Sequence, residues 1–77
     1  MMTEHARTVL DLLGGNSSPR TLPDIASLTG IAIIDVSQAV IRLQGQELIE
    51  AIALPNGAGF RITAKGRQHL EQAKAHP

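Results

Sequence analysis

The chain of 77 residues contains no cysteine, and Phe60 is its single aromatic residue. Without cysteine it cannot form a disulfide, an iron-sulfur cluster or a thiolate metal site. With one aromatic residue, the core has to be built from Ile, Leu, Val and Ala, within the 43% of residues that are apolar. Such a core is slim at this length. We therefore expect a single domain over residues 1–77, with extra burial supplied by oligomerisation or a partner.

Long apolar runs and an excess of charge are also missing. Nowhere are there about 18 consecutive apolar residues, and the first 15 residues contain an acid and too short an apolar run for a signal peptide. We therefore expect a soluble, cytoplasmic protein with no membrane segment. Seven basic side chains balance seven acidic ones, so the formal net charge is zero. This balance argues against strong non-specific binding of nucleic acid.

The stretch 21–50 predicts a helix-turn-helix. Thr21 is a suitable N-cap, with Pro23 and an acid in the first turn of a short helix. Gly30 permits the left-handed backbone of a tight corner. A longer helix should begin around residue 32 or 33, with its inward positions at helical spacing and its outward ones opposite. The buried side of the first helix is expected at Ile25, Ala26 and Leu28, and the inward face of the second at Val36, Ala39, Val40, Leu43 and Glu47.

The segments on either side complete the predicted fold. An amphipathic helix is expected from Thr3 to about Leu13. After residue 49 we expect a strand over 50–54, a turn over 55–59 rich in Pro, Asn and Gly, a return strand over 60–62, and a last helix from Ala64 to about Ala75 capped by Thr63. Leu70 and Ala73 are its main apolar residues. The pattern predicts an α+β winged helix, with a three-helix core, a two- or three-stranded wing and a C-terminal helix.

Charge is unevenly distributed along the chain. Residues 24–50 contain four acids and one base, Arg42, whereas residues 51–70 contain three bases, Arg61, Lys65 and Arg67, and no acid. Any contact to phosphates is therefore expected in the wing and at the start of the last helix.

Several spaced landmarks together resemble bacterial winged-helix transcription regulators of the MarR and related small families. They are Asp24-Ile25-Ala26, Thr29-Gly30-Ile31, residues 36–40 with Leu43, Leu48-Ile49-Glu50, and residues 62–67. The resemblance implies that the third helix lies in the major groove of DNA and that the wing reaches the adjacent backbone or minor groove. Carried onto this chain, the positions it implies for DNA contact are Ser37, Gln38 and Arg42 on the helix and Asn56, Arg61, Lys65 and Arg67 around the wing.

In this interpretation Gln38 pairs with adenine and Arg42 with guanine, while the bases near the wing hold phosphates. The chain departs from the family pattern in two places. Ile34 and Ile41 point away from the core, with Asp35 beside them, where base-reading helices are more polar. Family members usually have glycine just before the Leu-Ile pair, whereas this chain has Glu47 there and has glycine at 45, inside the predicted helix.

Two functions follow as hypotheses. The first is a DNA-binding transcription regulator, acting as a dimer or together with a larger protein because one domain of balanced charge holds few phosphates. The alternative is a winged-helix protein-interaction module with little DNA affinity of its own, similar to the small regulators of fimbrial operons. Ile34 and Ile41 would form its partner surface.

No enzyme, cofactor or metal site is expected. His5, His69 and His76 are far apart in the sequence and lack ligands at metal-binding spacing. Asn56-Gly57-Ala58-Gly59 is explained by turn chemistry, since no Lys-Ser pair and no helix follow it as in a phosphate-binding loop.

Overall fold

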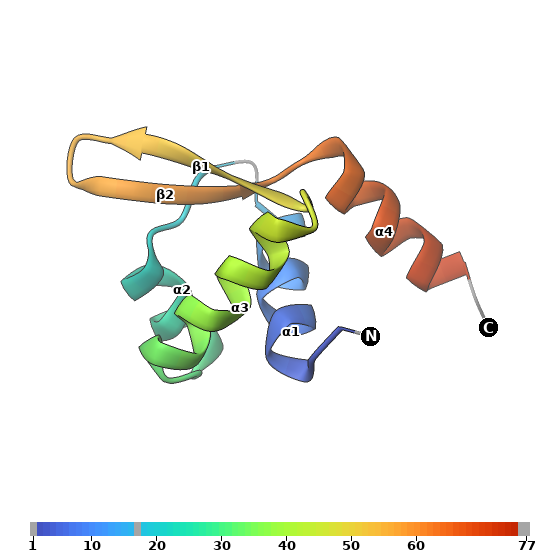
Figure 1. Ribbon diagram of the computed structural model, residues 1–77, viewed down its shortest axis with the longest axis horizontal. Helices are drawn as coiled ribbons and strands as arrows, with labels where there is room; N and C mark the ends of the chain where they lie inside the picture. Colours follow the sequence, from blue (N-terminus) through green and yellow to red (C-terminus); the bar gives the residue numbers. More distant parts are fainter. Residues whose placement is uncertain (1, 17, 76–77) are drawn as a thin grey trace.

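The computed structural model describes residues 2–16 and 18–75, and the side chains up to residue 72. Its elements follow the order α1 (Glu4–Gly14), α2 (Leu22–Thr29), α3 (Ile33–Gly45), β1 (Ile49–Leu54), β2 (Gly57–Ile62) and α4 (Ala64–Ala75). Helices α1, α2 and α3 lie together below the hairpin, whose tip extends past α2, while α4 leads away at the opposite end (Figure 1). This order and arrangement confirm the α+β winged helix expected from the sequence.

The predicted helix starts are present because their caps are local. Thr3 accepts a hydrogen bond from the Ala6 N–H, and Thr21 accepts one from the Asp24 N–H at 3.3 Å. Gly30 has φ 75°, in the left-handed region that glycine enters without a Cβ clash. Each cap satisfies an amide that would otherwise have no partner within its helix, and so fixes where the helix begins.

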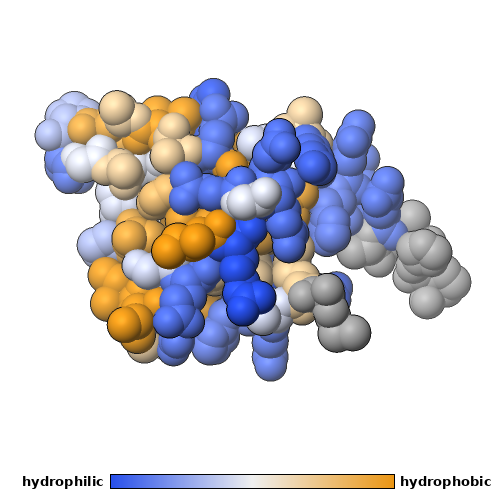
Figure 2. Space-filling view, in the orientation of Figure 1, coloured by the Kyte–Doolittle hydropathy of each residue, from blue (hydrophilic) through white to orange (hydrophobic). Residues whose placement is uncertain are grey.

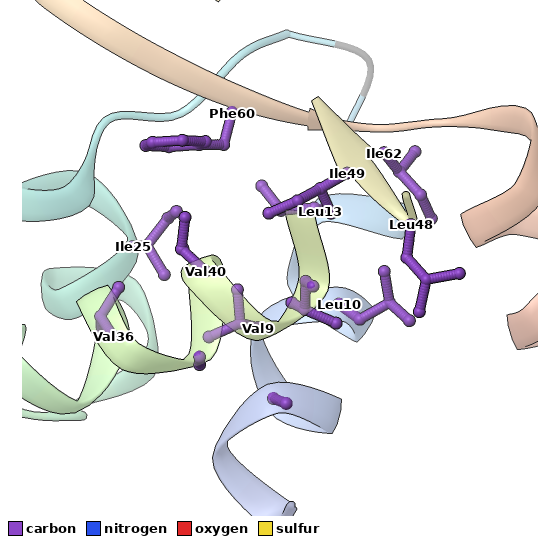
Figure 3. Close-up of a cluster of buried hydrophobic side chains, with 13 residues drawn as sticks. Val9, Leu10, Leu13, Ile25, Val36, Val40, Leu48, Ile49, Phe60 and Ile62 are labelled. Atoms are coloured by element: carbon purple, nitrogen blue, oxygen red, sulfur yellow. The ribbon is translucent and has the colours of Figure 1, made fainter. Parts of the chain in front are cut away.

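The core lies between the three N-terminal helices and one face of the hairpin. Phe60 on β2 extends over Ile25 and Val40, so the single aromatic ring closes the layer between the wing and the helix-turn-helix (Figure 3). All apolar inward positions expected on α3 are at most 3% exposed. The buried cluster consists of Ala6, Val9, Leu10, Leu13, Ile25, Val36, Ala39, Val40, Leu43, Leu48, Ile49, Phe60 and Ile62.

Leu28 is an exception to the sequence prediction. It was expected on the buried side of α2, but it is 56% exposed, whereas Ile25 is fully buried and Ala26 packs against the core. With eight residues, α2 is too short for a second buried layer, and Leu28 in its last turn lies beyond the packed contact. The prediction for Leu28 was wrong because helical spacing gives a direction but not the edge of the core.

The hairpin is tighter than the sequence predicts. Strand β2 begins at Gly57, and the antiparallel register pairs Leu54 with Gly57, so the connection is the two residues Pro55-Asn56 rather than the five residues 55–59. Gly57 has φ 129°, which suits glycine at this first strand position. On the other edge of β2, the backbone of Arg20 exchanges two hydrogen bonds with Phe60, so a single bridge extends the two-stranded sheet.

The geometry at the end of α3 concerns Glu47, which stands where the family pattern usually has glycine. The Glu47 N–H bonds to the Gln44 carbonyl and the Leu48 N–H to the Leu43 carbonyl, the pair of bonds of a Schellman motif. Glu47 occupies its left-handed position with φ 62°, the only positive φ among the described non-glycine residues. The expectation that Glu47 continues the inward stripe was therefore wrong, because α3 ends two residues earlier.

Thr63 connects this end of α3 to α4. Its hydroxyl donates to the Glu47 carbonyl at 2.7 Å and accepts from the Gly66 N–H at 3.0 Å. Gly66 itself lies against the Leu48 carbonyl and the Ile62 side chain, closer than a Cβ atom allows. Leu70 packs on the core from α4, whereas the side chain of Ala73 lies outside the described residues. The Thr63 hydroxyl thus links the end of α3 to the start of α4. The absence of a Cβ atom at Gly66 lets α4 pack closely against Leu48 and Ile62.

Candidate nucleic-acid interface

The outward face of α3 is exposed along its length. At about 100° per residue, Ile34, Gln38 and Ile41 fall within about 60° of one another, opposite the buried residues. Ile34 and Ile41 are 66% and 67% exposed. Arg42 is exposed on one flank of this face, and Ser37 is half-buried on the other. The helix therefore presents both the polar residues and the two isoleucines named from the sequence, and none of these side chains is part of the core.

The start of α3 is set by the corner before it. The Thr29 hydroxyl donates to the Ile25 carbonyl at 2.7 Å and accepts from the Ile31 N–H, which holds the chain on both sides of Gly30. Ala32, at the N-cap position, makes no side-chain cap. Asp35 in the first turn provides the negative charge that suits a helix N-terminus, and it is half-buried.

In the wing, the polar side chains are divided between tip and root. Asn56 is exposed in the two-residue connection at the tip. Arg61 lies four residues from the tip end of β2, roughly 13 Å away along the strand. There its Nε is 3.5 Å from Glu50 Oε2 on β1, directly across the ladder. Folding thus brings an acid beside a segment that is acid-free in sequence, and part of the Arg61 charge is compensated.

Lys65 and Arg67 lie on different sides of the start of α4. Lys65 lines a shallow hollow together with two acids, Glu47 and Glu50. Arg67 lines a neighbouring hollow with Asn16 and Arg61, and its Nη1 is 3.5 Å from the Gly14 carbonyl. The structure therefore brings Arg61 and Arg67 to one hollow at the root of the wing, while Lys65 lies in the hollow beside it.

Arg20 is a base that the sequence analysis did not single out. Its Nη2 donates to Asn16 Oδ1 at 3.0 Å, and Asn16 lines the same hollow as Arg61 and Arg67. No sequence signal points to it, because Arg20 is forty residues from Phe60 and reaches the wing only through the backbone bridge to that residue.

The two ends of the molecule have different surfaces. Figure 2 shows apolar surface over the corner between α2 and α3 and polar surface over the side that carries α4. The large apolar side chains that are more than half exposed are Leu28, Ile33, Ile34 and Ile41. Three of the four belong to α3, so this helix carries most of the large exposed apolar side chains among the described residues.

Nowhere in 2–16 and 18–75 do three His, Asp or Glu side chains gather closely enough to hold a metal ion, and His76 lies outside that range. No single described helix has the length and hydropathy to span a membrane. Only α2 and α3 taken together have that length and hydropathy, and this pair is bent by 113° at its junction.

Comparison with known proteins gives matches in structure. No family model matches the chain. No curated protein matches it in sequence either. A structure of Lactococcus lactis ZitR is similar to it at 25% identity, covering 99% of this chain and 53% of that one, with a TM-score of 0.83. A probable transcriptional regulator from Pseudomonas aeruginosa is also 25% identical, covering 95% and 57%, with a TM-score of 0.84.

A third similar structure is the S. aureus MepR-DNA complex. Its identity is 19%, it covers 96% of this chain and 63% of that one, and the TM-score is 0.86. In all three comparisons the chain spans less than two thirds of the neighbour's length, while nearly all of the chain is matched. The chain therefore has a winged-helix fold that resembles that of MarR-like bacterial transcription regulators.

Proposed function

We propose that this chain is a DNA-binding transcription regulator whose α3 enters the major groove while the wing lies on the backbone. The observation that carries the proposal is the outward face of α3, where Gln38 and Arg42 are exposed beside a projecting hairpin. Support also comes from the likeness to MepR, which is known in complex with DNA. A helix packed on its inner face and free on its outer one suits the groove-docking geometry of helix-turn-helix proteins.

Each proposed contact has its own chemistry. Arg42 would pair with guanine O6 and N7 and Gln38 with adenine N6 and N7, while Ser37 serves as a short donor on the flank. Asn56 at the tip would reach the neighbouring backbone. Arg61, Lys65 and Arg67 would supply phosphate contacts at the root of the wing, with Glu50 and Glu47 reducing the net charge that they offer.

The small number of bases makes a second DNA-bound unit necessary for tight binding. Three or four phosphate contacts give a slope of log K against log salt of about −3, and correspondingly modest affinity at physiological salt. We therefore propose that the chain acts as a homodimer or beside a larger regulatory protein. Both arrangements double or extend the phosphate contacts without further bases in this chain.

Fluorescence anisotropy with labelled duplexes at low salt tests this function. We expect binding that weakens with salt at the slope given above and that weakens about 5- to 150-fold for Arg42→Ala, since a bidentate base contact contributes about 1–3 kcal/mol. Arg7→Ala is the matched control, because it removes the same charge from an exposed position on α1. Absence of binding to any duplex, or equal losses for both variants, would remove the proposal.

A second candidate function is a protein-interaction module, favoured by the exposure of Ile34 and Ile41. Pull-down and sedimentation with the purified chain distinguish the two. A stoichiometric protein partner that is lost with Ile41→Asp, in a chain that binds no duplex at low salt, would replace the regulator by the interaction module.

A further inference from the structure

The outer stripe of α3, which we define as Ile34, Gln38 and Ile41, has an unusual composition for a solvent-facing surface. A glutamine lies between two isoleucines that are both about two-thirds exposed. The next residue of the same type, Ile33, is rotated from Ile34 by about 100° around the helix and therefore lies off the stripe. The stripe combines two apolar groups with one bidentate polar group on a narrow face.

The fold does not use these three side chains. Neither Ile34 nor Ile41 belongs to the buried cluster or to the partly buried residues packed against it. Gln38 is exposed and makes no side-chain hydrogen bond with the described residues. Their chemistry is therefore available to a ligand, and substitutions in the stripe leave the core intact.

The chemistry of the stripe matches one edge of a base pair. Arg42, which is exposed, and Asp35, which is half-buried, lie on the same flank of the stripe, about 20° apart around the helix, so the match rests on the three side chains of the stripe and not on charge. In the major groove of DNA, an A·T pair offers the thymine C5-methyl group to apolar side chains and adenine N6 and N7 to an amide. This combination matches the isoleucines and the glutamine of the stripe.

We infer that the outer stripe makes this chain a reader of A·T pairs, with Ile34 and Ile41 contacting thymine methyl groups and Gln38 pairing with an adenine between them. The inference rests on the proposed DNA-binding function and adds the class of sequence recognised. Ile34 and Ile41 are seven residues apart, or about 10.5 Å along the helix. At about 3.4 Å per base step, the two thymines lie roughly three steps apart.

Selection of tight-binding duplexes from a random library by the 77-residue chain provides the first test. We expect selected sites to contain two thymines about three steps apart with an adenine between them. The second test replaces those thymines by uracil, which removes only the methyl groups. By fluorescence anisotropy at low salt, each lost methyl contact should weaken binding roughly fourfold, from the transfer free energy of one buried methyl-sized group.

Protein variants assign the methyl groups to side chains. Ile34→Ala and Ile41→Ala should each weaken binding to the thymine duplex but change binding to the uracil duplex much less. Ile33→Ala is the matched control, since it removes the same side chain one residue away from the stripe, and it should bind each duplex as the unchanged chain does, with the same preference for thymine over uracil. Circular dichroism melting of all three variants checks that each is folded.

The outcomes separate this inference from the function on which it rests. Equal binding of thymine and uracil duplexes, or selected sites with G·C pairs at the positions assigned to the three stripe residues, would overturn the A·T reading while leaving DNA binding in place, whereas a G·C pair beside them is expected for Arg42. Failure to bind any duplex would overturn both. A chain dimer in sedimentation equilibrium that Ile41→Asp dissociates would assign the stripe to a second copy and likewise overturn the inference.

Discussion

The surfaces around the two ends of α3 differ in the side chains that they expose. At the apolar end, formed by Leu28, Ile33 and Ile34, large side chains are more than half exposed. At the charged end, formed by Glu47, Glu50, Arg61, Lys65 and Arg67, the side chains line two adjoining hollows in which acids and bases lie together. The bases that cluster in the sequence are thus partly compensated in the fold. The exposed isoleucines, which are apolar but outward-facing, are left available for a ligand.

The largest expected effect on the free energy of unfolding comes from a substitution at Gly66, which disrupts the packing at the charged end. In Gly66→Ala the new Cβ would meet the Leu48 carbonyl and the Ile62 side chain, so α4 has to move away from the wing. We expect a loss of about 1–3 kcal/mol in the free energy of unfolding, the usual cost of overpacking. Urea denaturation measures it. Gly45→Ala is the matched control, because its Cβ meets no atom within 4 Å, and it should be neutral or stabilising.

Removal of the Thr63 hydroxyl should destabilise the same charged end, with a smaller loss in the free energy of unfolding. Thr63→Val keeps the shape but removes both the cap of α4 and the bond to the Glu47 carbonyl. The expected loss is about 1–2 kcal/mol, within the range for N-cap residues. Thr63→Ser retains the hydroxyl and should keep most of the stability. If valine and serine variants unfold at the same urea concentration, the hydroxyl does not hold this junction.

Glu47 gives an effect of the opposite sign. Its left-handed backbone, with φ 62°, is unfavourable for a side chain and suits glycine. Glu47→Gly should therefore raise the free energy of unfolding by roughly 0.5–1 kcal/mol, after subtracting the greater freedom of glycine in the unfolded chain. Glu47→Ala removes the charge but keeps the strain. A gain in the alanine variant equal to that in the glycine variant would attribute the effect to charge instead.

The smallest expected effect is at the apolar end. Ile34→Ala should change the free energy of unfolding by less than about 0.5 kcal/mol, since its side chain is 66% exposed and packs on no core residue. Val36→Ala, two residues away and fully buried, should cost distinctly more. Thermal melts of the pair compare the two faces directly. Equal destabilisation would mean that Ile34 is part of the core after all.

Most of the fold was predictable because its signals are short in range. Thr21, Gly30 and Thr63 occupy the caps and the corner expected of them, and the apolar spacing of α3 gives its buried face correctly. The errors concern Leu28, the length of the hairpin turn, and Glu47. The competing terms were the edge of the core for Leu28, the strand register for the turn, and the Schellman hydrogen bonds that end α3 at Gly45 for Glu47.

The candidate interface was less predictable than the fold. Spacing alone identified Gln38, Arg42, Ile34 and Ile41 as outward residues, and their exposure agrees with it. The surroundings of Arg61 and Lys65 could not be foreseen, because Glu50 and Glu47 precede them by eleven or more residues and approach only when the hairpin closes and α4 packs. Whether these residues contact DNA remains a prediction for the binding measurements.

The sequence by itself determined where the helices begin, which face of α3 is buried, and that a hairpin follows, because caps, turns and apolar periodicity act over a few neighbouring residues. Only the tertiary structure decided which charges lie together and where Arg20 joins the sheet. These features depend on segments that are distant in the chain and meet only when the core forms, so no local pattern encodes them.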